Sequence, residues 1–223
     1  MPARELRFEV GGGAGEVSAL LELPPAARWL LALAHGAGAG MRHRFLEAAA
    51  AKLAARGIAT FRYQFPYIEA GRRSPDRPPR LTATVRAAVA AAAREAPGLP
   101  LLAGGKSMGG RMTSTAAAEA PLPGVRGLVF FGFPLHPPGR PGTERAGHLA
   151  AVGAPMLFLQ GTRDDFAGLD LLHPVLDRLG ARATLHVVDG ADHSFGVRKS
   201  TGRTGEQVLD ELADAVVAWA DGL

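Results

Sequence analysis

One serine of this chain lies in a pattern that could make it a nucleophile. Residues 101–112 read LLAGGKSMGGRM, and Gly105, Ser107 and Gly109 form Gly-x-Ser-x-Gly between a short apolar run and an alanine-rich segment. Such a pattern suits a sharp strand-to-helix turn that exposes the serine hydroxyl, with small residues two positions away on either side to avoid collisions. The chemistry it indicates is nucleophilic attack on a carbonyl.

The letters GKS in the same segment also resemble the end of a phosphate-binding loop. That loop needs a glycine five residues before Gly105, because successive backbone N–H groups must surround the phosphates. Pro100 occupies that position and has no N–H. No later strand ends in an acidic residue suited to holding magnesium beside the loop. We therefore favour the nucleophilic serine.

The partners of an activated serine are a histidine base and an acid that orients it, expected in the order Ser, Asp, His. Asp164 and Asp165 follow the apolar run MLFLQG, and His193 follows LHVVDGAD. Asp192 adjoins the histidine and Asp189 comes too early in its strand, so both are interpreted as turn-forming residues. The pattern leaves Asp164 and Asp165 as candidate acids.

Short apolar runs alternate with longer amphipathic ones, which predicts a doubly wound, mostly parallel α/β sheet flanked by helices in a single domain over 1–223. In such sheets, sites form at the carboxyl ends of strands. The predicted strands are Arg4–Val10, Glu16–Leu23, Trp29–Ala34, Ile58–Tyr63, Pro100–Ala103, Val125–Phe131, Pro155–Gln160 and Ala183–Val188. The predicted helices are Phe45–Arg56, Leu81–Glu95, Met108–Ala120, Leu169–Leu179 and Gly205–Ala220.

The segments GGKSMGGR, FPLHPPGRP and QGTRD, together with the order of the three polar residues, resemble the α/β-hydrolase superfamily. They are most similar to a dienelactone-hydrolase-like branch of small hydrolases, which includes predicted bacterial hydrolases and a eukaryotic subunit of a histone-acetyltransferase complex. The resemblance extends over nearly the whole chain. It implies the α/β-hydrolase fold. Only residues 132–154 separate two predicted strands where many lipases insert a helical lid, so we expect a minimal lid or none.

The resemblance also implies roles. The Gly-x-x-Asp position favours Asp164 over Asp165 as the acid. The oxyanion hole, two N–H groups that bind the carbonyl oxygen, would come from Met108 and from Ala37 in the segment HGAGAG. His35 is expected to hold that segment by hydrogen bonds. Lys106 replaces the histidine common there in lipases, and either pairs with an acid or faces the pocket.

Two further segments bear on the substrate. In GFPLHPPGRPG, three side chains could contact it, Phe133, His136 and Arg140, although a rigid proline-rich connector is an equal alternative. The segment GRRSPDRPPR from Gly71 to Arg80 is expected to be an irregular exposed loop. It is either merely solvated or a rim that attracts anionic substrates.

Composition narrows the remaining classes. The chain has no cysteine, which excludes thiolate nucleophiles and cysteine-ligated zinc. No apolar run approaches the roughly 20 residues of a membrane span, and the start lacks the pattern of a secretory signal. We expect a cytoplasmic monomer or homodimer without cofactor or metal. The net charge of +4 comes from scattered arginines, which disfavours nucleic-acid binding.

Two functions remain. The first is a serine hydrolase acting on a small ester or lactone through Ser107, His193 and Asp164. The alternative is a non-catalytic scaffold or binding protein that keeps the fold.

Overall fold

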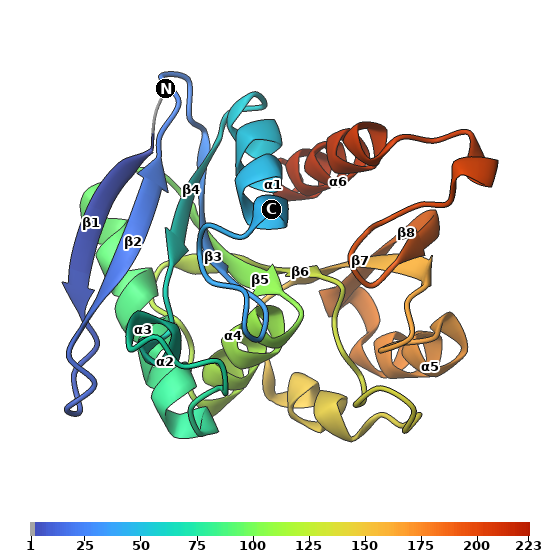
Figure 1. Ribbon diagram of the computed structural model, residues 1–223, viewed down its shortest axis with the longest axis horizontal. Coiled ribbons are helices and arrows are strands. Elements are labelled where there is room, and N and C mark those ends of the chain that lie inside the picture. The colour runs from blue at the N-terminus through green and yellow to red at the C-terminus, as the bar shows by residue number, and fades with distance from the viewer. Residues whose placement is uncertain (1–2) are drawn as a thin grey trace.

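The computed structural model describes residues 3–223 and is built around one eight-stranded sheet (Figure 1). Its strands run in the order β1-β2-β4-β3-β5-β6-β7-β8. The first two pairings, β1 with β2 and β2 with β4, are antiparallel, and all others are parallel. The strand bounds are β1 Arg4–Glu9, β2 Glu16–Glu22, β3 Trp29–Ala34, β4 Ile58–Tyr63, β5 Leu101–Lys106, β6 Val125–Phe131, β7 Met156–Arg163 and β8 Ala183–Asp192.

Helices cover both faces of this sheet. In Figure 1, α3, α4 and α5 lie on one side and α1 and α6 on the other. Their bounds are α1 Arg44–Ala54, α2 Pro66–Glu69, α3 Pro78–Glu95, α4 Met108–Glu119, α5 Leu169–Leu179 and α6 Gly205–Ala220, with 3₁₀ turns η1 Glu144–Ala151, η2 Gly180–Arg182 and η3 Lys199–Thr201. The predicted fold class, a doubly wound sheet flanked by helices, is confirmed.

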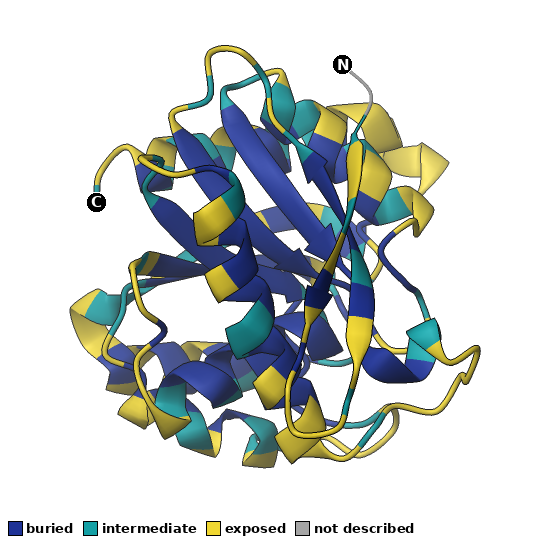
Figure 2. Ribbon diagram, turned by 90° about the vertical axis from the view of Figure 1, so that its left-hand side faces the viewer, coloured by how far each residue is buried: buried dark blue, intermediate teal, exposed yellow. Residues whose placement is uncertain are grey.

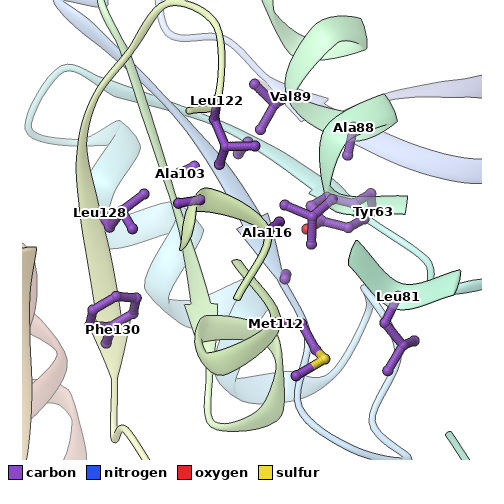
Figure 3. Packing of buried hydrophobic residues seen from close by; sticks show 14 of the residues in the cluster. Tyr63, Leu81, Ala88, Val89, Ala103, Met112, Ala116, Leu122, Leu128 and Phe130 are labelled. Carbon is purple, nitrogen blue, oxygen red and sulfur yellow. The ribbon is translucent and has the colours of Figure 1, made fainter. Parts of the chain in front are cut away.

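The two faces carry separate apolar cores. The central strands β3 and β4 are buried along their whole length, as expected of parallel strands covered on both sides. Figure 2 shows these strands as buried and the outer faces of the helices as exposed. On the α4 side, Met112 and Ala116 pack in one cluster with Ala103 of β5 and Phe130 of β6 (Figure 3). The sheet is therefore a rigid support for the turns at its edge.

Several predicted bounds need correction. Helix α3 begins at Pro78, inside the segment predicted to be irregular, because a proline is well suited to the first turn of a helix. Strands β5 and β8 continue to Lys106 and Asp192, beyond their predicted ends. The short elements α2, η1, η2 and η3 were not predicted.

The connection between β6 and β7, residues 132–155, carries η1, which packs against α4 and α5 at the side of the sheet. It forms no helical cover over the strand ends, in agreement with the predicted minimal lid. In the described chain, no helix is long and apolar enough to cross a membrane.

Candidate active site

Ser107 occupies the tip of the turn between β5 and α4 with φ 51° and ψ −116°. A non-glycine residue in such a conformation costs about 1–3 kcal/mol and persists only where its surroundings impose it. The neighbouring glycines supply that constraint. A Cβ on Gly105 would lie 2.6 Å from the Ala34 carbonyl oxygen, and one on Gly109 would lie 2.6 Å from that of His35. The motif is therefore required for close packing of the turn against the end of β3.

The structure brings the serine together with the predicted histidine and acid. His193 Nε2 lies 2.9 Å from Ser107 Oγ, and His193 Nδ1 lies 2.7 Å from Asp164 Oδ2. The carboxylate is almost completely buried and the imidazole is partly exposed. Because Asp164 Oδ2 can only accept a hydrogen bond, the imidazole proton lies on Nδ1 of His193. Nε2 of His193 is then free to accept a hydrogen bond from the hydroxyl of Ser107. This is the arrangement in which a histidine can remove the serine proton.

Two residues that the sequence analysis missed hold the carboxylate. Gln160 Nε2 donates to Asp164 Oδ2 at 2.6 Å, and the Phe166 N–H donates to Oδ1 at 2.8 Å. The Phe166 ring also stacks on the imidazole of His193 at a centroid distance of 4.2 Å. Gln160 is the polar residue within the apolar run MLFLQG and is fully buried, which was the available signal in the sequence.

The remaining aspartates are arranged differently. Asp165 is exposed, and its side chain makes no hydrogen bond within residues 3–223. Asp192 Oδ1 accepts from the N–H groups of Ser194 and Gly196 at 2.8 and 2.9 Å. It therefore stabilises the turn that follows His193, as predicted.

The two predicted oxyanion donors border the same cavity as Ser107. Met108 is the first residue of α4, so its N–H has no acceptor within the helix. Ala37 lies two residues after His35, whose side chain holds the loop. His35 Nε2 accepts from the Phe65 N–H at 3.1 Å, and its Nδ1 donates to the Gly36 carbonyl at 2.7 Å. Burial lowers the pKa of His35 to about 4. A neutral histidine thus holds the loop, as predicted.

The cavity beside Ser107 has a volume of about 370 Å³. It would accommodate a small molecule, and part of the segment 71–80 forms one of its walls. That wall is formed by Pro75, Asp76 and Pro78. Besides Ala37, Ser107 and Met108, the remaining lining residues are Leu81, Arg111, Met112, Pro134, Pro138, Arg145 and Phe166.

The predicted substrate contacts need correction. Phe133 is fully buried and packs against Phe130 and Phe158, so its side chain has no surface to offer a substrate. His136 and Arg140 do not line the cavity. Pro134 and Pro138 of the same segment line the cavity instead. The Nδ1 atom of His136 lies 2.9 Å from the carbonyl oxygen of Pro137.

A family model described as an alpha/beta hydrolase domain matches residues 27–221, nearly the whole chain. The chain belongs to this family. It shares the α/β-hydrolase fold with a serine hydrolase without lid from Xanthomonas campestris, at a TM-score of 0.74 and 22% identity over 98% of this chain and 95% of the other. A dienelactone hydrolase from Anabaena variabilis has a TM-score of 0.74 at 20% identity, and the match covers 98% of this chain and 97% of the other. A serine hydrolase homologue from Coxiella burnetii has a TM-score of 0.77 at 17% identity, and the match covers 96% of this chain and 98% of the other.

This α/β hydrolase contains a second serine–histidine pair. Ser114 Oγ on α4 lies 2.7 Å from His148 Nε2 on η1. Neither residue lines the cavity, and no carboxylate bonds to His148 among residues 3–223. Burial lowers the pKa of His148 to about 4, helped by the positive charge of Arg111. His148 therefore has no carboxylate partner comparable to Asp164, which bonds to His193.

Lys106 follows neither predicted alternative. Its Nζ donates to the His193 carbonyl oxygen at 2.6 Å and lies 5.5 Å from the centre of the Phe195 ring. It does not line the cavity, and it forms no ion pair within the described chain. The side chain of Lys106 thus ties the end of β5 to the loop that carries the histidine. Burial lowers the pKa of Lys106 to about 8, although the charges of Asp164 and Asp192 oppose this shift.

A depressed pKa makes the stability contribution of Lys106 depend on pH. Between pH 8 and 10.5 the unfolded chain binds a proton at Lys106 that the folded chain does not, so unfolding becomes less favourable as the pH rises. We expect the free energy of unfolding of the wild type, relative to Lys106→Met, to rise by up to about 3 kcal/mol over this window. Urea denaturation at several pH values measures the difference.

The matched control is Lys52→Met. Asp210 and Glu206 raise the pKa of the partly exposed Lys52, so its stability contribution should not increase over the same window. A difference between wild type and Lys106→Met that stays flat or falls with pH would contradict the assignment of a depressed pKa.

Proposed function

We propose that this protein is a serine hydrolase that cleaves small carboxylic esters or lactones through an acyl-enzyme on Ser107. The observation that carries the proposal is the continuous hydrogen-bonded chain from Ser107 Oγ through His193 to Asp164. We further propose that the whole chain forms one catalytic domain. Two similar solved structures support the choice of substrate class by their descriptions, a dienelactone hydrolase and an esterase domain from Rhodothermus marinus.

In the proposed reaction, Ser107 Oγ attacks the carbonyl carbon while its proton passes to His193 Nε2. The carbonyl oxygen becomes an oxyanion, which accepts hydrogen bonds from the N–H groups of Met108 and Ala37. When the tetrahedral intermediate collapses, the bond to the leaving oxygen breaks, and His193 returns the proton to that oxygen. The product is an alcohol and an acyl group on the serine.

Water completes the cycle by the same steps. His193 Nε2 removes a proton from the water as it attacks the acyl carbon, and then returns the proton to Ser107 Oγ as the acid product leaves. Asp164 keeps the imidazole in the orientation and tautomer needed for both halves and stabilises its cation. The buried amide of Gln160 and the N–H of Phe166 hold the carboxylate in place throughout.

A fluorophosphonate probe tests the proposal, because it reacts only with a serine activated by a base. We expect labelling of the native protein, loss of labelling after heat denaturation, and retention of labelling in Ser114→Ala. p-Nitrophenyl esters of increasing acyl length would then define the size limit of the cavity. A folded protein that takes up no label and cleaves none of these esters would favour a non-catalytic scaffold and contradict the proposal.

A further inference from the structure

Two arginines line the cavity that contains Ser107. Arg111 lies on α4, one turn after the serine, and Arg145 lies on η1. Arg145 Nη1 donates to the carbonyl oxygen of His136 at 3.1 Å, which fixes its guanidinium at the wall. A guanidinium has five N–H donors. The guanidinium of Arg145 makes no other hydrogen bond to residues 3–223, so most of its donors remain available.

Arg111 has no partner for its charge within residues 3–223. Its Nε is buried without a hydrogen-bond partner, and its guanidinium makes no ion pair. Burial and the like charge of Arg145 lower the pKa of Arg111, yet arginine stays protonated in proteins. The neighbouring His148 is neutral near pH 7, so it supplies no negative charge. The two cationic side chains are thus uncompensated where they meet the cavity.

Asp76 is the acid that lines this cavity, and its Oδ2 is buried without a hydrogen-bond partner. Its Oδ1 accepts from Arg72 Nη2 at 2.6 Å, and Arg80 Nε lies 3.8 Å from its Oδ2. These contacts lie within the segment 71–80 and the first turn of α3. Asp76 thus pairs with Arg72 and Arg80, and within residues 3–223 it forms no ion pair with Arg111 or Arg145.

We propose that Arg111 and Arg145 form a subsite for an anionic group, so that the preferred substrate is a small ester or lactone carrying a free carboxylate. A partly buried charge without a counter-charge is unfavourable, and a bound carboxylate would offset that cost. The planar fork of a guanidinium matches the two oxygens of a carboxylate. This inference rests on the proposed function and adds the chemical class of its substrate.

The first test compares two esters with the same leaving group, p-nitrophenyl hydrogen glutarate and p-nitrophenyl hexanoate. The quantity measured is the ratio of their kcat/KM values, which cancels any general loss of activity. We expect the wild type to favour the acidic ester, and Arg111→Met to lower the ratio by about 10- to 100-fold, the usual effect of losing a hydrogen bond to a charged group. Arg145→Met provides a second variant if Arg111→Met folds poorly, and should lower the ratio in the same direction.

The matched control is Arg73→Met, which removes an exposed arginine of the segment 71–80 that does not line the cavity. Direct contact predicts that the ratio survives in Arg73→Met and at about 0.5 M salt, where the Debye length is only a few ångströms. A wild-type ratio near one, or an unchanged ratio in both cavity variants, overturns the subsite. A preference lost in Arg73→Met and at high salt assigns the effect to the rim instead.

A binding experiment separates this inference from the proposed function. Calorimetric titration of Ser107→Ala with glutarate should give an affinity at least about tenfold higher than that of Ser107→Ala/Arg111→Met. This result supports the subsite even if the wild type cleaves no ester. Equal affinities overturn the subsite even if the wild type is an active esterase. Tighter binding of inorganic phosphate than of glutarate would overturn the assignment to a carboxylate.

Discussion

Replacement of Ser107 by alanine is expected to lower kcat/KM for p-nitrophenyl butyrate by at least about 10⁴-fold. The alanine leaves His193 and the two oxyanion donors in place but removes the oxygen that would form the acyl-enzyme. The strained backbone at position 107 is imposed by packing of the turn, so the fold should survive. Initial rates of p-nitrophenol release, with circular dichroism to verify folding, measure the effect.

Ser114→Ala is the matched control, because Ser114 lies on the same helix and is also bonded to a histidine. We expect it to retain most of the activity and to lose about 1 kcal/mol of stability, the usual contribution of a buried hydrogen bond. An active Ser107→Ala together with an inactive Ser114→Ala would transfer the nucleophile to the second pair.

Asp164→Asn is expected to lower kcat by about 10⁴-fold, as in the best-studied triad of this type. Asp164 Oδ2 accepts from Gln160 and His193, and Oδ1 accepts from the Phe166 N–H. Because both oxygens face donors, either orientation of an asparagine amide places its NH₂ group against another donor. The imidazole would then lose its orientation, its tautomer or both. Steady-state kinetics at neutral pH measure the loss.

Asp165→Asn makes the same chemical change at the adjacent residue. Asp165 is exposed and its side chain makes no hydrogen bond within the described residues, so we expect kcat to stay close to that of the wild type. Equal losses in the two variants would point to a general disturbance of the loop. A severe loss in Asp165→Asn alone would assign the acid to Asp165.

The sequence predicted the central strands and two helices with the bounds that the structure has. Trp29–Ala34 is a continuous apolar run, and Ile58–Tyr63 and Val125–Phe131 are short, mostly apolar runs between turn residues, which is the pattern of strands covered on both faces. Leu169–Leu179 and Gly205–Ala220 have apolar residues at helical spacing. A local pattern suffices to predict these bounds because it extends over the whole element and stops where the element ends.

Elements that depend on long-range pairing were predicted less well. Strand β8 continues past Val188 because Arg163 of β7 pairs with Asp192, a partner that no local pattern reveals. The 3₁₀ segment η1 was not predicted, and it forms where the chain packs against α4 and α5.

The sequence by itself also determined the order and type of the three polar residues, since a nucleophile turn and two strand-end loops each have a local pattern. Only the tertiary structure decided what surrounds them. It buried Phe133 in the core, bonded Lys106 to the carbonyl oxygen of His193, and bonded Gln160 to the carboxylate of Asp164. It also brought Arg111 and Arg145 to one cavity wall from separate elements. These are contacts between side chains distant in sequence, and their distances are set by how the helices and connections pack on the sheet.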